Sequence, residues 1–432
     1  ITSIFQLLLP IASIVMSGFT SPVPVSIKAK RTHNPIRAIV DNLKPPKDHP
    51  KKMMNLALGD PTAYGNLKCP AVLMDAVQES LTNQNSNGYL PSTGLLSARQ
   101  AIASTVTLPD CEVTEDDVVI ASGCSGALEL AITVLVNEGD NILVPCPGFP
   151  LYQVIAESLG GEVKHYNLLP EAGWECDLEH MASLVDDRTR AIVLTNPSNP
   201  CGSNYTASHL EGVVALARKY NLPIIADEIY GGCVFDGVFT SVSSVSGDVP
   251  VLVLGGMAKE FIVPGWRVGW LSIVDRSSEP KTMGEVKSGL KSLSQLILGA
   301  CSLVQRAVPR ILTPAPGSAD EASLKKFNDF YMDVIRTNSE ICLTEAAKVP
   351  ELTAVPAKGA MYVMVHVDLT RLTGFTDDTD FCARLLMEEN VFVLPGQCFG
   401  MTNYFRLVTC PPSEIMTEAW ERLELFCAKY RK

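Results

Sequence analysis

The chain of 432 residues is long enough for two domains, and its 47% hydrophobic residues can form a substantial core. The net charge of −12 and the lack of a basic patch argue against a nucleic-acid partner. The 13 cysteines are scattered, without CxxC pairs or zinc-type His/Cys spacing, so we expect no metal and a reducing, intracellular environment.

The first twenty residues carry no charge and are largely apolar. By themselves they resemble a membrane or secretory segment, but they lack an initiator Met and a basic region, and they contain Pro10. Three interpretations stay open: a non-native extension, a targeting segment, and an arm that is disordered or packs on another subunit. We treat residues 1–30 as an N-terminal extension.

The folded chain is expected to begin with a helix that Asn34 caps and Pro35 opens. A short apolar strand over residues 54–58 then breaks at Gly59. This glycine belongs either to a plain turn or to a point where the backbone approaches a ligand closely. Tyr89 lies in a later turn before a helix and, from the residues alone, is expected to be exposed.

Residues 118–136 predict a strand, a turn of small residues and a helix. In the turn, Gly123, Cys124 and Ser125 offer backbone N–H groups, a hydroxyl and a helix N-terminus to an anion such as phosphate. The GxGxxG pattern is absent, which disfavours a nicotinamide dehydrogenase. After the next strand, flanking prolines hold Phe149 either in the core or against a flat ligand.

Strands and helices alternate over residues 141–274, which predicts a mostly parallel sheet covered by helices. Asp227 interrupts an apolar run at the carboxyl end of one strand, where a buried carboxylate needs a cationic partner. Lys259 follows another strand and is placed to bond covalently to an aldehyde cofactor, while Arg267 suits a phosphate. Solvated side chains at a strand end are the alternative for both cations.

Residues 281–311 predict one long helix that leads out of the first domain, and a Pro/Gly-rich breaker follows. Helices then alternate with short strands, two of them over residues 360–367 and 404–409. Arg406 lies within the second strand. There it either extends to water or grips a carboxylate.

Together with Asn199, in the segment over residues 196–202, these motifs strongly resemble the fold-type I, pyridoxal-phosphate-dependent aminotransferases of class I/II. The resemblance covers roughly residues 31–430 and is nearest to the tyrosine aminotransferase branch. It implies an α/β fold whose large domain has a mostly parallel, seven-stranded sheet covered by helices. The implied domains are an arm and part of a small domain at 31–80, a large cofactor-binding domain at 81–311, and the rest of the small α/β domain at 312–432.

The resemblance also implies which residues bind pyridoxal 5'-phosphate and the substrate. Lys259 is implied to hold the cofactor covalently and, once released, to move a proton from the substrate. Asp227 keeps the ring nitrogen protonated, and Tyr230 bonds the ring oxygen. Further cofactor contacts are implied for Asn199, Gly123, Cys124, Ser125, Phe149, Arg267 and Tyr89 of a second subunit, and substrate contacts for Arg406, Gly59 and Asn199.

Three features differ among relatives. Gly256 stands where many of them have a phosphate-binding serine, and Glu260 stands where a basic residue is common in the tyrosine branch. Dicarboxylate-specific relatives bring an arginine from the neighbouring subunit in the region of residues 291–301, which here is mainly apolar and includes Leu296 and Ile297. An apolar pocket favours aromatic or other apolar amino acids over dicarboxylates.

The implied activity is transamination of L-tyrosine and other aromatic L-amino acids to the aryl-pyruvate, with 2-oxoglutarate or pyruvate as the acceptor. A pyridoxal-phosphate-dependent carbon–sulfur lyase, an alanine or broad-specificity aminotransferase, and a non-catalytic scaffold are the alternatives. The resemblance implies a homodimer. We expect a cytoplasmic protein, with mitochondria as the alternative, and neither nucleic-acid nor membrane partners.

Overall fold

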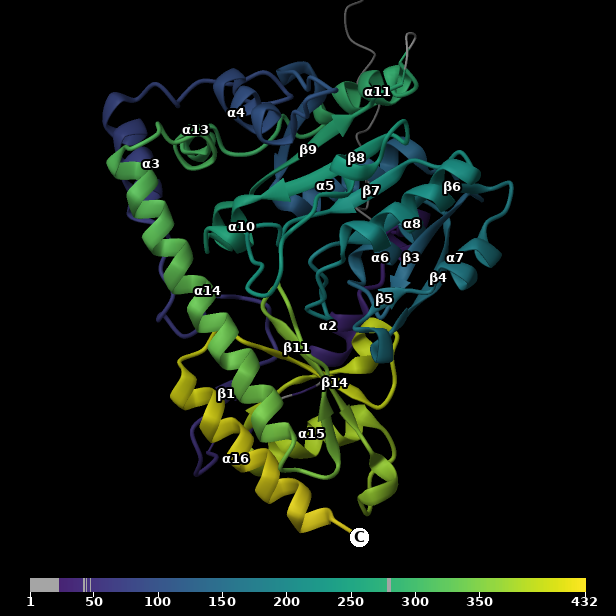
Figure 1. Ribbon diagram of the computed structural model, residues 1–432, viewed down its shortest axis with the longest axis vertical. Helices are drawn as coiled ribbons and strands as arrows, with labels where there is room; N and C mark the ends of the chain where they lie inside the picture. The colour runs from purple at the N-terminus through teal and green to yellow at the C-terminus, as the bar shows by residue number, and fades with distance from the viewer. Residues whose placement is uncertain (1–22, 42, 44, 47, 278–280) are drawn as a thin grey trace, which may run out of the picture.

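The computed structural model describes residues 23–41, 43, 45–46, 48–277 and 281–432, so the apolar segment over residues 1–20 lies outside the described residues. Figure 1 shows a large sheet above a small one, with helix α14 (Ala319–Ala346) running along both. At the end of the predicted extension, α1 (Ile27–Arg31) contacts α6 (Leu151–Ser158), and Arg31 pairs with Glu138 at 2.8 Å. In the described part of the chain, no helix combines the length and apolar character that crossing a membrane requires.

The large sheet has a parallel centre. Strands β4, β3, β6, β7 and β8 pair in parallel, whereas β9 runs antiparallel to both of its neighbours. The mostly parallel sheet is confirmed, but the described residues form eight strands instead of the predicted seven. The additional edge strand, β5, is too short to show any alternation in sequence. The spatial order is β2 (Val118–Ser122), β9 (Val268–Val274), β8 (Val251–Gly256), β7 (Ile224–Asp227), β6 (Thr189–Thr195), β3 (Asn141–Cys146), β4 (Glu162–Leu169) and β5 (Glu175–Cys176).

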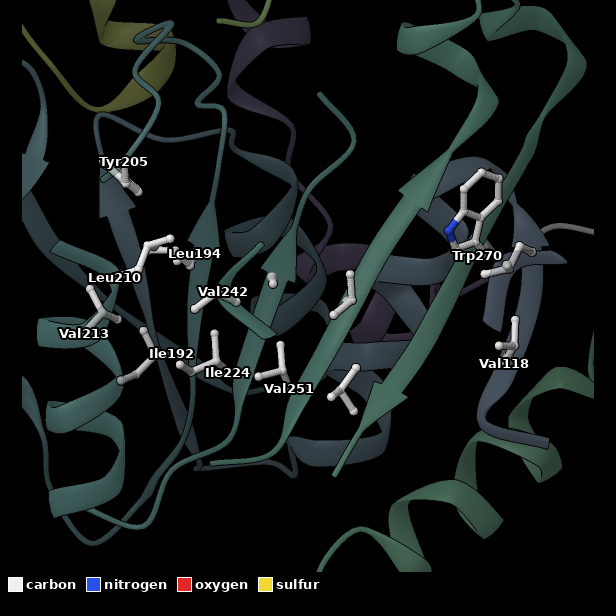
Figure 2. Packing of buried hydrophobic residues seen from close by; sticks show 14 of the residues in the cluster. Val118, Ile192, Leu194, Tyr205, Leu210, Val213, Ile224, Val242, Val251 and Trp270 are labelled. Atoms are coloured by element: carbon white, nitrogen blue, oxygen red, sulfur yellow. The ribbon is translucent and has the colours of Figure 1, made fainter. Parts of the chain in front are cut away.

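Helices cover both faces of this sheet because successive side chains of a strand point to opposite sides. In β6, Ile192 and Leu194 pack with Leu210 and Val213 of α8, as Figure 2 shows, whereas Val193 belongs to the core on the other face. Burying each such side chain stabilises the fold by roughly 1.5–3 kcal/mol. The first face is covered by α3 (Ala71–Asn83), α4 (Leu96–Val106), α8 (Ala207–Lys219), α9 (Val242–Val245), α12 (Ser302–Gln305) and α13 (Val308–Leu312), and the second by α5 (Gly123–Leu135), α6 and α11 (Gly284–Ser294).

The small sheet is antiparallel throughout, in the order β10 (Leu352–Ala354), β11 (Tyr362–Val367), β14 (Tyr404–Val408) and β13 (Leu394–Pro395). A parallel pair, β1 (Met54–Asn55) with β12 (Val391–Phe392), joins the N-terminal segment to the C-terminal one. Buried residues of β1 share a core with α14, α15 (Asp378–Glu389) and α16 (Ser413–Tyr430), so both ends of the chain build this part, as predicted. The residue boundaries of the domains stay predictions, and the one at residue 80 falls inside α3.

One expected element is wrong. The long helix predicted over residues 281–311 is three helices, α11, α12 and α13, among the described residues. Leu298 and Gly299 adopt left-handed backbone angles, with φ of 64° and 79°, which no α-helix can continue through.

Near the start of the chain, α2 (Pro35–Val40) begins as expected, and Asn34 accepts a bond from the Arg37 N–H at 3.3 Å. The remaining short elements are α7 (Leu178–Leu184), α10 (Met257–Glu260), η1 (Glu115–Asp117), η2 (Pro170–Ala172), η3 (Pro264–Trp266), η4 (Leu369–Arg371) and η5 (Gly396–Phe399).

Candidate active site

A cavity of about 290 Å³ lies at the carboxyl ends of the central parallel strands, where the large sheet meets the small one. Thr195 ends β6, Asp227 ends β7, and Lys259 follows β8 on α10. Tyr362 and Arg406 reach the same cavity from the small sheet. The predicted site residues that line it are Gly59, Cys124, Ser125, Phe149, Asn199, Asp227, Tyr230, Lys259, Arg267 and Arg406.

Asp227 is 5% exposed and is held only by neutral donors. Its Oδ2 accepts the Tyr152 hydroxyl at 2.8 Å, and its Oδ1 accepts the Ile229 N–H at 3.3 Å and lies 3.6 Å from the Cys124 Sγ. Burial raises the pKa of this carboxyl, and the bonds from Tyr152, Ile229 and Cys124 lower it. No ion pair joins Asp227 to another described residue, so a cation inside the cavity would be its natural partner.

Lys259 faces the cavity without a carboxylate partner among the described residues. Its Nζ donates to the carbonyl oxygen of Gly59, 200 positions earlier in the chain. A Cβ on Gly59 would lie 2.5 Å from the Tyr362 hydroxyl oxygen. Gly59 is therefore a point of close approach beside the cavity rather than a plain turn, and a bulkier residue would displace its neighbours.

The N-terminus of α5 and Arg267 form a cradle suited to an anion. In any α-helix the N–H groups of the first turn have no acceptor within the helix, and in α5 no side chain caps them. The Arg267 guanidinium lies beside them and donates to the carbonyl oxygens of Ser122 at 3.2 Å and Pro264 at 3.1 Å. Gly123 has a φ of 71°, and a Cβ there would lie 2.5 Å from the Arg267 Nη2. The glycine thus leaves room for the guanidinium.

The presence of glycine rather than serine at position 256 has a steric explanation. A Cβ on Gly256 would lie 3.0 Å from the Gly269 Cα, and a Cβ on Gly269 would lie 2.3 Å from the Cys124 backbone nitrogen. A serine in place of Gly256 would need β9 and Ile229 to shift by a few tenths of an ångström. The close packing of β8 against β9 therefore favours glycine over serine at this position.

Arg406 is 3% exposed, which excludes the alternative that it extends to water. It donates to the Asn199 Oδ1 at 2.8 Å and to the Ala57 carbonyl oxygen at 2.7 Å, and its guanidinium lies 4.3 Å from the Tyr362 ring centre. Its Nε is buried without a hydrogen-bond partner, and it forms no ion pair with another described residue. Burial lowers the pKa of this group. A carboxylate would supply both the missing charge and the missing acceptor.

Three residues at this site were not predicted. The Tyr152 hydroxyl bonds both Asp227 and the Thr195 Oγ1, the latter at 2.7 Å, and the Tyr362 hydroxyl lies 2.7 Å from that of Tyr230. The spacing of Tyr152 three residues after Phe149 was the only available signal, since it places both rings on one side of the start of α6.

Two predicted residues do not line the cavity. Gly123, the first residue of α5, belongs to the cradle but is not among the residues that line the cavity. Tyr89 is 94% exposed, so within one chain it is not brought to the site.

The cavity fits an enzyme that holds a flat, phosphorylated cofactor between a lysine and a buried carboxylate and takes a substrate carboxylate on a buried arginine. The protein-family model "Aminotransferase class I and II" matches residues 51–423 of this chain. The chain is 43% identical to tyrosine aminotransferase of Homo sapiens over 93% of this chain and 87% of that one, and 43% identical to tyrosine aminotransferase of Dictyostelium discoideum over 95% and 97%. A solved tyrosine aminotransferase from Leishmania infantum superposes with a TM-score of 0.88 at 35% identity, covering 95% of this chain and all of that one.

The chain therefore belongs to the class I and II aminotransferases. It is an enzyme of this family, and the family uses pyridoxal 5'-phosphate.

Proposed function

We propose that the protein transfers the amino group of L-tyrosine, and of other aromatic L-amino acids, to a 2-oxo acid. One observation carries the proposal: Lys259, Asp227 and Arg406 line a single cavity. A lysine for proton transfer, a carboxylate for a cationic ring and an arginine for an α-carboxylate are the three groups that amino-acid transamination requires. The similarity to tyrosine aminotransferases supports tyrosine as the donor.

Each residue has a proposed task. Bound pyridoxal phosphate supplies an aldehyde that carries the amino group and a ring that accepts electrons. Asp227 holds a proton at the ring nitrogen, and Lys259 removes the proton from the substrate Cα. The cradle of α5 and Arg267 holds the phosphate, so the cofactor stays bound while Lys259 moves protons. The other proposed contacts are Phe149 against the ring, Tyr230 and Asn199 at the ring oxygen, Cys124 and Ser125 at the phosphate, and Arg406 and Gly59 at the substrate carboxylate.

We also propose a homodimer in which Tyr89 completes the phosphate site of the second subunit. Leu296 and Ile297 are 77% and 78% exposed in a single chain, as residues that line a neighbouring subunit's pocket would be. Apolar side chains there would select an aromatic substrate over a dicarboxylate. The proposed compartment is the cytoplasm, with mitochondria as the alternative, and the 13 free cysteines are consistent with either.

The test uses purified protein loaded with pyridoxal phosphate and no 2-oxo acid. Adding L-tyrosine should change the cofactor absorbance and release one equivalent of the aryl 2-oxo acid per site, because the first half of a transamination needs no acceptor. Lys259→Ala should bind cofactor without releasing product. A response to alanine but not to tyrosine would overturn the proposal that tyrosine is the amino donor. Release of ammonia with pyruvate from a sulfur amino acid would favour the carbon–sulfur lyase.

A further inference from the structure

A second cavity, of about 600 Å³, lies apart from the one that contains Lys259. One wall is the ends of β8 and β9, and the opposite wall is the first half of α14. Its volume is in the range of small-molecule sites. Neither the proposed reaction nor its substrates use this space.

Glu228, Glu260 and Glu321 line this cavity, and the first two have no cationic partner among the described residues. Glu228 and Glu260 follow Asp227 and Lys259 directly in the chain. One oxygen of Glu228 accepts the Ser241 hydroxyl at 3.0 Å and the Val242 N–H at 2.9 Å. Glu260 has no hydrogen-bond or ion-pair partner, and burial raises the pKa of both carboxyls to about 7. Glu228 and Glu260 are half-buried, and carboxyl groups in such a place without a cationic partner gain from a cation that desolvates with them.

An indole provides an independent indication of a ligand. Trp270 is 7% exposed and stands off β9 toward β8, as Figure 2 shows. Trp270 lines the cavity, and its Nε1–H is not sealed from solvent and has no acceptor among the described residues. Phe239, Phe261 and Phe327 also line the cavity and supply aromatic surface.

The charged residues of the opposite wall do not neutralise the two acids. Lys325 lines the cavity but pairs with Asp329 at 2.6 Å on the same helix. Glu321 accepts the Gly317 N–H at 2.7 Å and adds a third acidic side chain. The lining thus combines three carboxyl groups with aromatic surface and with side-chain N–H donors, those of Trp270 and Asn328, that have no acceptor among the described residues.

We propose that this cavity binds a small organic cation that carries a hydrogen-bond acceptor. The cationic group pairs with Glu260 and the free oxygen of Glu228 against the aromatic wall, and the acceptor takes the Trp270 N–H. This proposal does not depend on the substrate of the Lys259 cavity.

Choline is the probe, because its quaternary nitrogen cannot bond to an aldehyde cofactor and its hydroxyl can accept the indole N–H. Titration calorimetry of the full chain loaded with pyridoxal phosphate should show one saturable site per chain. Glu260→Gln should raise the Kd about tenfold or more, as expected for loss of a charged partner. Trp270→Phe should weaken choline binding but leave binding of tetramethylammonium, which has no hydroxyl, unchanged.

Two further variants separate the site from general effects. Glu421→Gln makes the same charge change at an exposed position of α16 and should leave the Kd unchanged. Gly232→Ala keeps the charge but would place a Cβ 2.3 Å from the Glu260 carboxyl carbon, so it should displace the carboxylate and weaken binding. Absence of saturable binding, or equal affinity in wild type and Glu260→Gln, would overturn the proposal. Displacement of choline by substrate carboxylates would place choline in the Lys259 cavity and would also overturn the proposal.

Discussion

The carboxylate of Asp227 acquires its chemistry from side chains that lie far away in the chain. Tyr152 donates to it while contacting Thr195, and this pair fixes the direction of the carboxylate within a buried pocket. Burial raises the pKa of Asp227 and the Tyr152 bond lowers it, so the tyrosine favours the ionised form that a protonated ring nitrogen requires. Tyr152 is in this sense a positioning residue.

Tyr152→Phe should lower kcat about 10- to 100-fold, because a hydrogen bond to a charged group contributes about 1.5–3 kcal/mol. It should also move the acid limb of the kcat/KM profile to higher pH. Without the bond the pKa of Asp227 rises further, so the carboxylate protonates, and activity is lost, sooner as the pH falls. Steady-state kinetics from pH 5 to 9 would measure both effects.

Tyr166→Phe is the matched control for this prediction. The Tyr166 hydroxyl is also buried, but it donates to the Val193 carbonyl oxygen at 2.8 Å, away from the cavity. This variant should lose stability without moving the pH profile. Identical pH profiles for the two variants would show that Tyr152 acts only through stability.

At the scale of elements, the anion cradle depends on how closely α5 approaches β9 and Arg267. Gly123, Gly256 and Gly269 are each in positions where a Cβ would press on a neighbouring backbone or on the guanidinium. Because these glycines have no side chains, the N-terminus of α5, β8 and β9 can approach one another closely. The cradle is therefore a product of packing between elements rather than of a loop sequence alone.

Gly123→Ala should raise the Kd for pyridoxal phosphate about tenfold, because its Cβ would displace the Arg267 guanidinium. Gly173→Ala is the control, since Gly173 also has a positive φ, 65°, but has nothing within 4 Å of its Cβ position. Both variants should lose stability by about 1–3 kcal/mol through backbone strain. Cofactor titration and thermal melts would separate the effects; an equal loss of cofactor affinity in both variants would refute the packing explanation.

At the scale of the whole molecule, the described chain leaves apolar and aromatic side chains exposed near one edge of the large sheet. Leu296 and Ile297 follow α11, and Tyr89 precedes α4. Gly299 lies against this region, because its Cβ position is 3.3 Å from the Ser92 carbonyl oxygen. Exposed apolar groups of this kind favour association of two chains.

Ile297→Glu should therefore shift the proposed dimer toward monomer, since a charge would be buried at the interface. Cofactor affinity should fall with it if Tyr89 serves the second subunit. Val238→Glu introduces the same side chain at a site that is 80% exposed and should leave the mass unchanged. Sedimentation velocity at micromolar concentration would measure the masses; an unchanged dimer in Ile297→Glu would contradict the predicted interface.

Sequence reasoning identified the charged residues of the site because charge within or beside an apolar strand is costly and therefore conspicuous. Asp227, Lys259 and Arg406 each stand at such a place, and the structure brings all three to one cavity. The alternation of strands and helices predicted the parallel sheet, because the periodicity that marks each element is a local property of the chain.

Tertiary structure decided what depends on neighbours distant in sequence. Tyr362 meets Tyr230 across 132 positions, and Tyr152 meets Asp227 across 75, so no local pattern could show either contact. The apolar pattern over residues 281–311 gave no sign of the left-handed turn at Leu298, because periodicity reports which residues prefer burial and not which backbone angles packing imposes. By itself, the sequence determined the family, the order of strands and helices and the costly charges; only the packing of distant segments decided which neutral groups hold those charges in place.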